Sequence, residues 1–149
     1  MQVPIQVREA RRESLRVHVP NDPYVLIVDD DTSILSVVSF LLDTEDYPNI
    51  SIGQSVDVLP FLNELHRSEG RLPSLILLDL MMPSVSGYDI AAVLSKHPRL
   101  SRIPVIIMTA DYRVTTASDV PGVVEVVNKP FHIEMLLDKI EQYFVPEQK

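Results

Sequence analysis

Three consecutive aspartates and one further aspartate each follow a short apolar run, and their carboxylates are the strongest chemical signal in this 149-residue sequence. Asp29–Asp31 follow Val25–Val28, and Asp79 follows Leu75–Leu78. Crowded carboxylates repel one another and therefore need a hard cation, and Mg²⁺ prefers oxygen ligands. A carboxylate is also a competent nucleophile towards phosphorus. These residues therefore predict a site for a divalent cation and a phosphoryl group.

A hydroxyl group and an ammonium group follow two further apolar runs. Thr109 and Ala110 follow Val105–Met108, and Lys129 stands just after Val123–Val127. A transferring phosphoryl group carries negative charge, which a metal ion, an ammonium group and a hydroxyl donor all stabilise. A phosphate on an aspartate adds strong acceptor oxygens that can draw a threonine side chain across. The combination is typical of a site that is switched by phosphorylation.

The hydrophobic periodicity predicts the elements that position these residues. Short apolar runs rich in β-branched residues alternate with stretches whose apolar residues recur at helical spacing. Strands are expected at residues 24–28, 50–53, 75–78, 105–108 and 123–127, and helices at residues 34–42, 58–65, 86–97 and 133–144, with a weak helix at 112–119. This alternation predicts an α/β fold with a doubly wound, five-stranded parallel sheet in the flavodoxin-like order 2-1-3-4-5. Ligands of such sheets bind at the carboxyl ends of the strands, which the residues above follow.

Composition and charge exclude several other classes of function. The sequence has 13 Lys and Arg against 21 Asp and Glu, a net charge of −8, which argues against direct binding of nucleic acid. It has no cysteine, which excludes disulfides, thiolate zinc sites and thiol catalysis. The apolar runs are too short to cross a membrane, and Met1–Ala10 lacks the apolar stretch of a secretory signal. We therefore expect a soluble, cytoplasmic protein.

The boundary of the folded domain is expected near residue 22. Residues 1–20 contain four arginines and two glutamates, whereas the rest of the chain is strongly acidic, and Pro20 and Pro23 bracket the change. We therefore expect a flexible basic arm at residues 1–22, one domain at residues 23–145 and a short tail at residues 146–149.

Four motifs in this order resemble the receiver domains of bacterial two-component response regulators. They are VLIVDDD (Val25–Asp31), LILLDLMMP (Leu75–Pro83), MTA (Met108–Ala110) and NKPF (Asn128–Phe131), and the resemblance covers residues 24–145. It implies a protein of a phosphorelay, which accepts a phosphoryl group from a sensor histidine kinase or a histidine phosphotransfer protein. Such a domain catalyses its own phosphorylation and dephosphorylation and is not a turnover enzyme.

The resemblance also implies the roles of individual residues. Asp79 would be the phosphoacceptor; Asp30, Asp79 and the main-chain carbonyl of Met81 would bind Mg²⁺, with Asp29 acting through water; Thr109, Ala110 and Lys129 would contact the phosphoryl group. The Lys129–Pro130 peptide bond would be cis. A homodimer would form through the face of the fourth helix, the fifth strand and the last helix.

The sequence departs from the family pattern at the expected output face. Val126 stands where the family usually has an aromatic residue that reports the movement of the threonine, so a rotating aromatic switch is not expected. The segment between Thr109 and Lys129 is also shorter than usual. Met81 and Asp111 occupy the two positions that border the approach of the hydrolytic water. Because a thioether cannot orient water by hydrogen bonding, slow self-dephosphorylation is expected.

Two other functions fit part of the pattern. A haloacid-dehalogenase-type phosphohydrolase would use Asp29 as its nucleophile with Asp31 two residues later, but the acidic pair required after Lys129 is absent from the sequence. A receiver-like module that binds proteins without being phosphorylated is the second alternative. Asp31 is also well placed to cap the helix that follows it.

Overall fold

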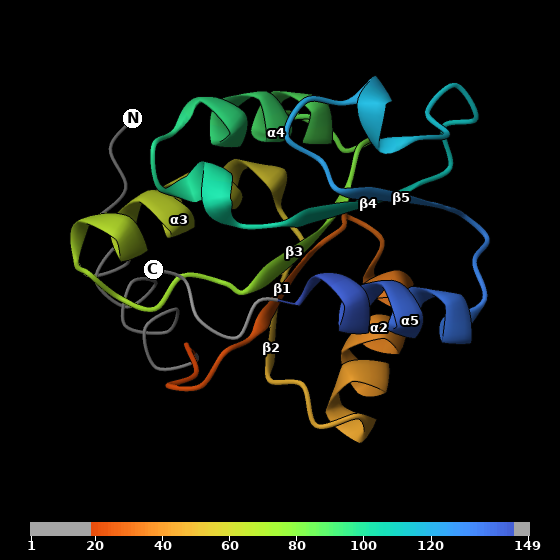
Figure 1. Ribbon diagram of the computed structural model, residues 1–149, viewed down its shortest axis with the longest axis horizontal. Coiled ribbons are helices and arrows are strands. Elements are labelled where there is room, and N and C mark those ends of the chain that lie inside the picture. Colours follow the sequence, from red (N-terminus) through yellow and green to blue (C-terminus); the bar gives the residue numbers. More distant parts are fainter. Residues whose placement is uncertain (1–18, 145–149) are drawn as a thin grey trace.

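The computed structural model describes residues 19–144, which form a five-stranded parallel sheet. The strands are β1 (Val25–Val28), β2 (Asn49–Ile52), β3 (Leu75–Asp79), β4 (Val105–Thr109) and β5 (Glu125–Asn128). Their order in the sheet is β2-β1-β3-β4-β5, so the predicted doubly wound topology is confirmed (Figure 1). All neighbouring strands are parallel, and the carboxyl ends of the strands therefore share one edge.

Four α-helices of the described residues cover the two faces of the sheet. They are α2 (Thr32–Thr44), α3 (Val58–Arg67), α4 (Gly87–Lys96) and α5 (Ile133–Tyr143). Helices α3 and α4 lie on one face and α2 and α5 on the other (Figure 1). Short 3-10 turns, η1 (Ser55–Asp57), η2 (Leu100–Arg102) and η3 (Ala117–Asp119), lie in three of the connections.

The central strands are apolar throughout because both of their faces are buried. Every residue of β1, β3 and β4 is buried. Successive side chains of a strand point to opposite faces, so Leu26 and Val28 pack with α3 and α4, whereas Val25 and Ile27 pack with α2 and α5. One hydrophobic cluster thus packs on each face of the sheet, and the buried strands fix the positions of the residues that follow them.

Side-chain caps set the start of two helices beside this edge. The carboxylate of Asp31 accepts hydrogen bonds from the backbone N–H groups of Ser33 and Ile34 at the start of α2. Ser86 and Asp89 form a reciprocal capping box at the start of α4. Both caps satisfy backbone donors that the first turn of a helix leaves free.

The weak helix expected at residues 112–119 is absent, and that prediction is wrong. The connection between β4 and β5 contains only the 3-10 turn η3, while Val114 and Val120 anchor it in the core. The carboxylate of Asp119 accepts hydrogen bonds from the backbone N–H groups of Thr115 and Thr116. These side-chain bonds compete with the hydrogen bonds of a helix, and β-branched residues favour helices weakly. The face expected to form a homodimer therefore has no α-helix between β4 and β5.

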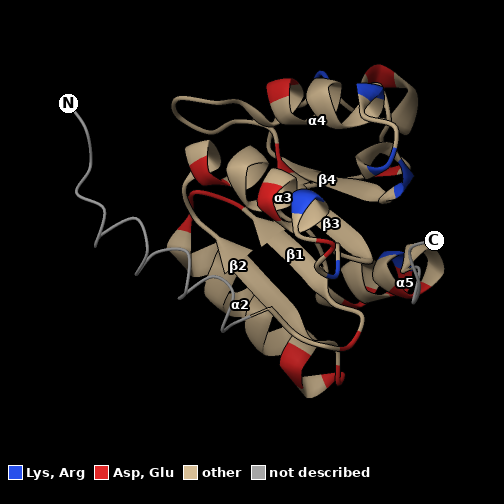
Figure 2. Ribbon diagram, turned by 90° about the vertical axis from the view of Figure 1, so that its left-hand side faces the viewer, with Lys and Arg blue, Asp and Glu red and all other residues tan. Residues whose placement is uncertain are grey.

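Charge is distributed unevenly over the described residues. No lysine or arginine occurs between Val19 and His66, so all charged side chains of α2, of most of α3 and of the loops around β1 and β2 are acidic, as Figure 2 shows. None of the helices within residues 19–144 is both long and apolar enough to span a membrane. Most of the expected basic arm and the expected tail lie outside the described residues.

Candidate functional site

Three carboxylates meet at the carboxyl edge of the sheet. Asp79 is the last residue of β3 and pairs in register with Met108, while Asp29 and Asp30 directly follow the neighbouring strand β1. Each of the three aspartates has a carboxylate oxygen within 4.8 Å of the others. Asp29 and Asp79 are buried, whereas Asp30 is exposed. The cluster therefore has an inner pair of carboxylates and one solvent-facing carboxylate, an oxygen-rich donor set of the kind that a hard divalent cation takes.

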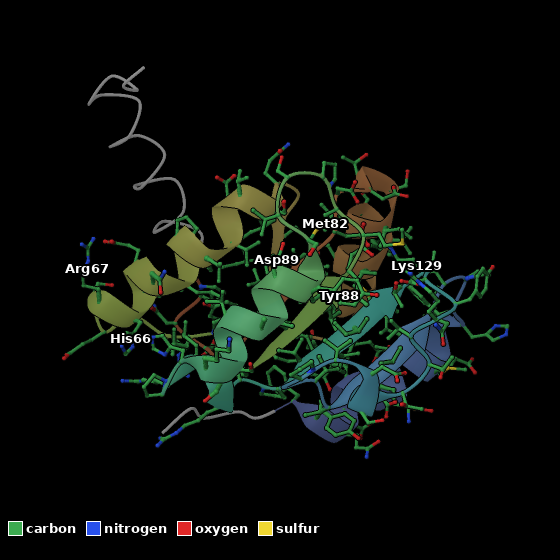
Figure 3. The ribbon with its side chains drawn as sticks, turned by 90° about the horizontal axis from the view of Figure 1, so that it is seen from above. His66, Arg67, Met82, Tyr88, Asp89 and Lys129 are labelled. Atoms are coloured by element: carbon green, nitrogen blue, oxygen red, sulfur yellow. The ribbon has the colours of Figure 1, made fainter. Side chains whose placement is uncertain are left out.

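Lys129 supplies the positive charge of the cluster. It follows β5, and its Nζ lies 2.6 Å from Oδ2 of Asp29 and 3.7 Å from Oδ1 of Asp79. The backbone N–H of Lys129 donates to the carbonyl of Thr109, and the Lys129–Pro130 peptide bond is cis. Lys129 is labelled in Figure 3, which shows the molecule from above. The ammonium group thus neutralises the inner pair of carboxylates only in part.

The environment of Asp79 disfavours its charged form. Burial, followed by the charge of Asp29, raises the pKa of Asp79 from 3.8 to about 6, although Lys129 and the backbone N–H of Met81 act in the opposite direction. Burial and a neighbouring negative charge both destabilise the charged form of a carboxyl group. A cation that binds in the cluster would stabilise that charged form. Asp79 therefore combines a raised pKa with a position in a cluster of carboxylates that would favour binding of a cation.

The loop after β3 runs beside the cluster. The backbone N–H of Met81 points to Oδ1 of Asp79 at 3.4 Å, and the side chain of Met81 is exposed while that of Met82 is buried. Gly87 closes the loop, because its N–H donates to the carbonyl of Leu80 at 2.9 Å. A Cβ atom at Gly87 would stand 2.1 Å from the carbonyl oxygen of Asp79, so only glycine allows this close approach.

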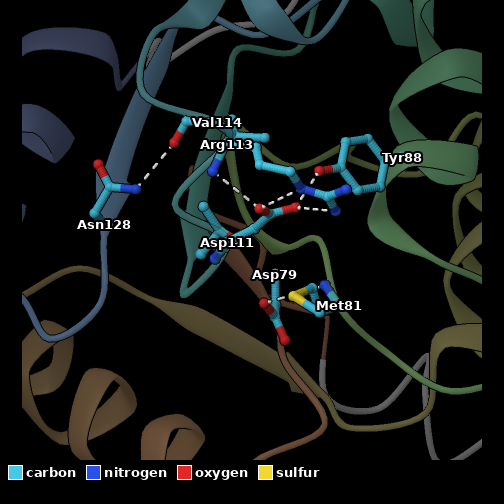
Figure 4. A network of polar contacts seen from close by, with 8 residues as sticks. Asp79, Met81, Tyr88, Asp111, Arg113, Val114 and Asn128 are labelled. Carbon is cyan, nitrogen blue, oxygen red and sulfur yellow. Dashed lines mark hydrogen bonds and ion pairs between the residues drawn. The ribbon is translucent and has the colours of Figure 1, made fainter.

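Thr109 and Asp111 lie at the end of β4 but differ in their surroundings. The buried hydroxyl of Thr109 accepts a hydrogen bond from the backbone N–H of Asp111 at 3.0 Å. The carboxylate of Asp111 accepts a 2.8 Å hydrogen bond from the hydroxyl of Tyr88 and two 2.9 Å bonds from the guanidinium group of Arg113 (Figure 4). Ala110, between them, is exposed.

Arg113 and Tyr88 bind the charged form of Asp111. Hydrogen bonds from the side chain and backbone of Arg113, and then from Tyr88, hold the pKa of the Asp111 carboxyl well below its ordinary value. The carboxylate of Asp111, which we predict to border the path of the hydrolytic water, is held between α4 and its own loop. Neither Tyr88 nor Arg113 was singled out from the sequence, because no local pattern marks a contact between residues so far apart.

Val126 lies on β5, half-buried, and packs against the cluster formed with α3 and α4. The amide of Asn128, at the end of the same strand, donates to the carbonyl of Val114 at 3.0 Å. The connection between β4 and β5 is therefore tied at two places, to α4 through Asp111 and to β5 through Asn128.

Comparisons with known proteins identify the family of this chain. Residues 25–141 match the family model of the response regulator receiver domain. The DNA-binding response regulator MtrA of Mycolicibacterium paratuberculosis is 31% identical over 121 residues, which are 78% of this chain and 48% of that protein. PhoB, the phosphate regulon transcriptional regulatory protein of Rhizobium meliloti, is 29% identical over 124 residues, 80% of this chain and 51% of that protein. The chain spans about half the length of the curated relatives it matches.

Solved structures show the same fold. A response regulator receiver domain protein from Clostridium thermocellum is 26% identical with a TM-score of 0.68, covering 82% of this chain and 94% of that chain. The receiver domain of sensor histidine kinase PA1611 from Pseudomonas aeruginosa, with a magnesium ion coordinated in its active site cleft, is 18% identical with a TM-score of 0.66 and covers 83% of this chain and 98% of that chain. This chain belongs to the response regulator receiver domain family, the phosphorelay signalling module of two-component systems.

Proposed function

We propose that Asp79 is the phosphoacceptor of this receiver domain and that the phosphoryl group comes from a phosphohistidine of a sensor histidine kinase or a histidine phosphotransfer protein. The observation that carries the proposal is the position of its carboxylate, buried at the end of the central strand β3, between two further aspartates and a lysine. Burying a carboxylate among other carboxylates costs stability, so its presence at this position supports a functional role.

The donor set fits Mg²⁺. Asp30, Asp79 and the main-chain carbonyl of Met81 would hold the ion, with Asp29 acting through water, which gives only oxygen ligands and leaves room for water and phosphoryl oxygens. When bound, the ion supplies positive charge against the phosphoryl oxygens and the crowded carboxylates. The exposed side chain of Asp30 leaves this side of the cluster open to solvent.

The residues of the chain account for the remaining steps of transfer. An oxygen of Asp79 forms a bond to phosphorus while the phosphorus–nitrogen bond to the donor histidine breaks, and the imidazole nitrogen leaves with the bonding electron pair and takes up a proton. Lys129, 3.7 Å from Asp79, pairs with the phosphoryl oxygens. The hydroxyl of Thr109 accepts from the N–H of Asp111, so its own proton is free to be donated to a phosphoryl oxygen. Ala110, the next residue, is proposed to contact the phosphoryl group as well.

We assign the chain a signalling role without turnover of an external substrate, in the cytoplasm, where kinases find ATP. The relatives are described as DNA-binding proteins, but the net charge of −8 supports no direct contact of this domain with nucleic acid. A homodimer would use β5, α5 and the loop between β4 and β5.

Mass spectrometry after incubation with acetyl phosphate and Mg²⁺ tests the proposal. We expect one phosphoryl group on the parent and none on Asp79→Asn, with the matched variant Asp31→Asn labelled like the parent. Phosphate on Asp29 would instead indicate the phosphohydrolase alternative. No label on the folded parent would favour a module that acts without phosphorylation.

A further inference from the structure

In the loop that carries the proposed carbonyl ligand, the side chains of Leu80 and Met82 are buried in the core, and the segment beyond them is held by hydrogen bonds. The base of the loop is closed by the hydrogen bond between the N–H of Gly87 and the carbonyl of Leu80. Ser84, near its tip, has a φ of 70°, in the left-handed region that non-glycine residues avoid. The backbone N–H of Met81 has only a long contact of 3.4 Å with Asp79. A loop with strained backbone at its tip needs outside contacts to keep its shape.

Ser55 provides those contacts from a different connection of the sheet. It begins the turn η1 after β2, and its side chain is buried. Its hydroxyl donates to the carbonyl of Pro83 at 2.6 Å and accepts from the N–H of Val85 at 3.1 Å. The N–H of Val85 also donates to the carbonyl of Pro83 at 2.9 Å, so the Ser55 hydroxyl adds a second contact to each of these two groups on either side of Ser84.

The same contact borders a hollow beside the carboxylate cluster. The hollow has a volume of about 260 Å³ and is lined by Asp30, residues 53–56, Pro83 and Ser84. Asp30, from the β1 edge, and Pro83, two residues beyond Met81, therefore face the same space. Ser55 holds the far wall of that space at a fixed position relative to Asp30.

We propose that Ser55 is a positioning residue for the cation site, which fixes the loop so that the carbonyl of Met81 is in place for Mg²⁺. The proposal rests on the proposed function of the site. Mg²⁺ demands nearly ideal octahedral geometry, whereas Ca²⁺ accepts a variable number of ligands in flexible arrangements. Without the contacts of Ser55, the loop would have to become ordered each time an ion binds, which weakens binding. We expect this loss of affinity to be larger for Mg²⁺, which needs the carbonyl in one position, than for Ca²⁺.

Calorimetric titration of the full chain with Mg²⁺ and with Ca²⁺ tests the proposal. For Ser55→Ala we expect Mg²⁺ affinity about three- to tenfold weaker, as for the loss of one or two hydrogen bonds, and a smaller loss for Ca²⁺. Ser55→Thr keeps the hydroxyl and restores Mg²⁺ affinity to within about twofold of the parent. Thermal melting without metal shows that each variant is folded.

Ser74→Ala is the matched control. Ser74 is also buried and lies just before β3 at the opposite edge of the sheet, and its hydroxyl has no hydrogen-bond partner among residues 19–144. We expect its metal affinities to equal those of the parent. Equal losses of Mg²⁺ and Ca²⁺ affinity in Ser55→Ala, or no loss, overturn the positioning role. If the parent binds no Mg²⁺, the proposed cation site itself fails.

Discussion

The hydroxyl of Tyr88 donates a 2.8 Å hydrogen bond to the carboxylate of Asp111 and so joins α4 to the loop that follows β4. The N–H of Asp111 in turn donates to the hydroxyl of Thr109, the group proposed to meet the phosphoryl oxygen. Two hydrogen bonds thus lead from the switch hydroxyl to α4. They lie on the same side of the sheet as the cluster against which Val126 packs, in a chain that has no aromatic residue at that position.

Tyr88→Phe should loosen the loop between β4 and β5. The substitution removes one hydrogen-bond donor to the Asp111 carboxylate, while the hydrogen bonds from Arg113 remain. We therefore expect several-fold faster amide exchange at residues 110–119 of the unphosphorylated protein. Hydrogen exchange read by mass spectrometry measures this. Tyr112→Phe is the control, because Tyr112 is 82% exposed and should exchange like the parent. Identical exchange in parent and Tyr88→Phe would show that the contact does not order the loop.

Asp79→Asn should stabilise the metal-free protein in a pH-dependent way. The folded carboxyl, with its pKa raised from 3.8 to about 6, keeps a proton that the unfolded chain releases over this interval, so stability of the parent falls as the pH rises through it. We expect the variant to be more stable by about 1–3 kcal/mol above pH 6 and equal to the parent below pH 4.

Thermal melting in the presence of a chelator, from pH 3.5 to 8, measures the difference. Asp22→Asn, at an exposed position, serves as the control and should melt like the parent throughout. A constant difference between Asp79→Asn and the parent at every pH would contradict the expected linkage.

Asp30→Ala should abolish both Mg²⁺ binding and phosphorylation while leaving the fold intact. Removing one of three neighbouring carboxylates relieves their repulsion, so the metal-free variant should be at least as stable as the parent. The adjacent Asp31→Ala should do the reverse, because Asp31 caps α2 and its loss costs about 1 kcal/mol without affecting the cation. A clear drop in the metal-free melting temperature of Asp30→Ala would contradict the expectation.

Thr109→Ala should still accept phosphate at Asp79 but lose most of the conformational response. The hydroxyl provides the contact that favours one state over the other, and without it the phosphate has little influence on the loop. The measurement is the change in amide exchange over residues 112–127 upon phosphorylation. Thr109→Ser keeps the hydroxyl and should keep the change. Equal changes in the parent and Thr109→Ala would exclude this residue as the switch.

Met81→Asn should shorten the lifetime of the phosphate. The exposed Met81 side chain offers no hydrogen bond to an incoming water molecule, and Asp111 is held by Tyr88 and Arg113, so self-dephosphorylation of the parent should be slow. An amide that orients water should speed the decay about tenfold if the barrier falls by about 1.4 kcal/mol. Met81→Leu, of similar length and apolar, should decay like the parent. Equal rates of phosphate loss in the parent and Met81→Asn would show that Met81 does not limit self-dephosphorylation.

The sheet and the edge where the site lies could be predicted from the amino-acid sequence. Strands buried on both faces must be apolar throughout, so the runs Val25–Val28, Leu75–Leu78 and Val105–Met108 could be recognised locally. The alternation with helical spacing then required parallel strands, which placed Asp79 and the aspartates after β1 side by side. The bounds of β2 and β5 were less certain, since half-buried edge strands carry a weaker signal.

The contacts that hold the connections beyond that edge could not be predicted from the sequence and became visible in the folded structure. The segment from Tyr112 to Asp119 has a weak helical pattern, but the carboxylates of Asp111 and Asp119 bind its backbone N–H groups and leave no α-helix there. The pairing of Tyr88 with Asp111 and of Ser55 with Pro83 leaves no trace in the periodicity. Periodicity reports which face of an element is buried, whereas a polar contact between distant loops depends on where the packed sheet brings their ends.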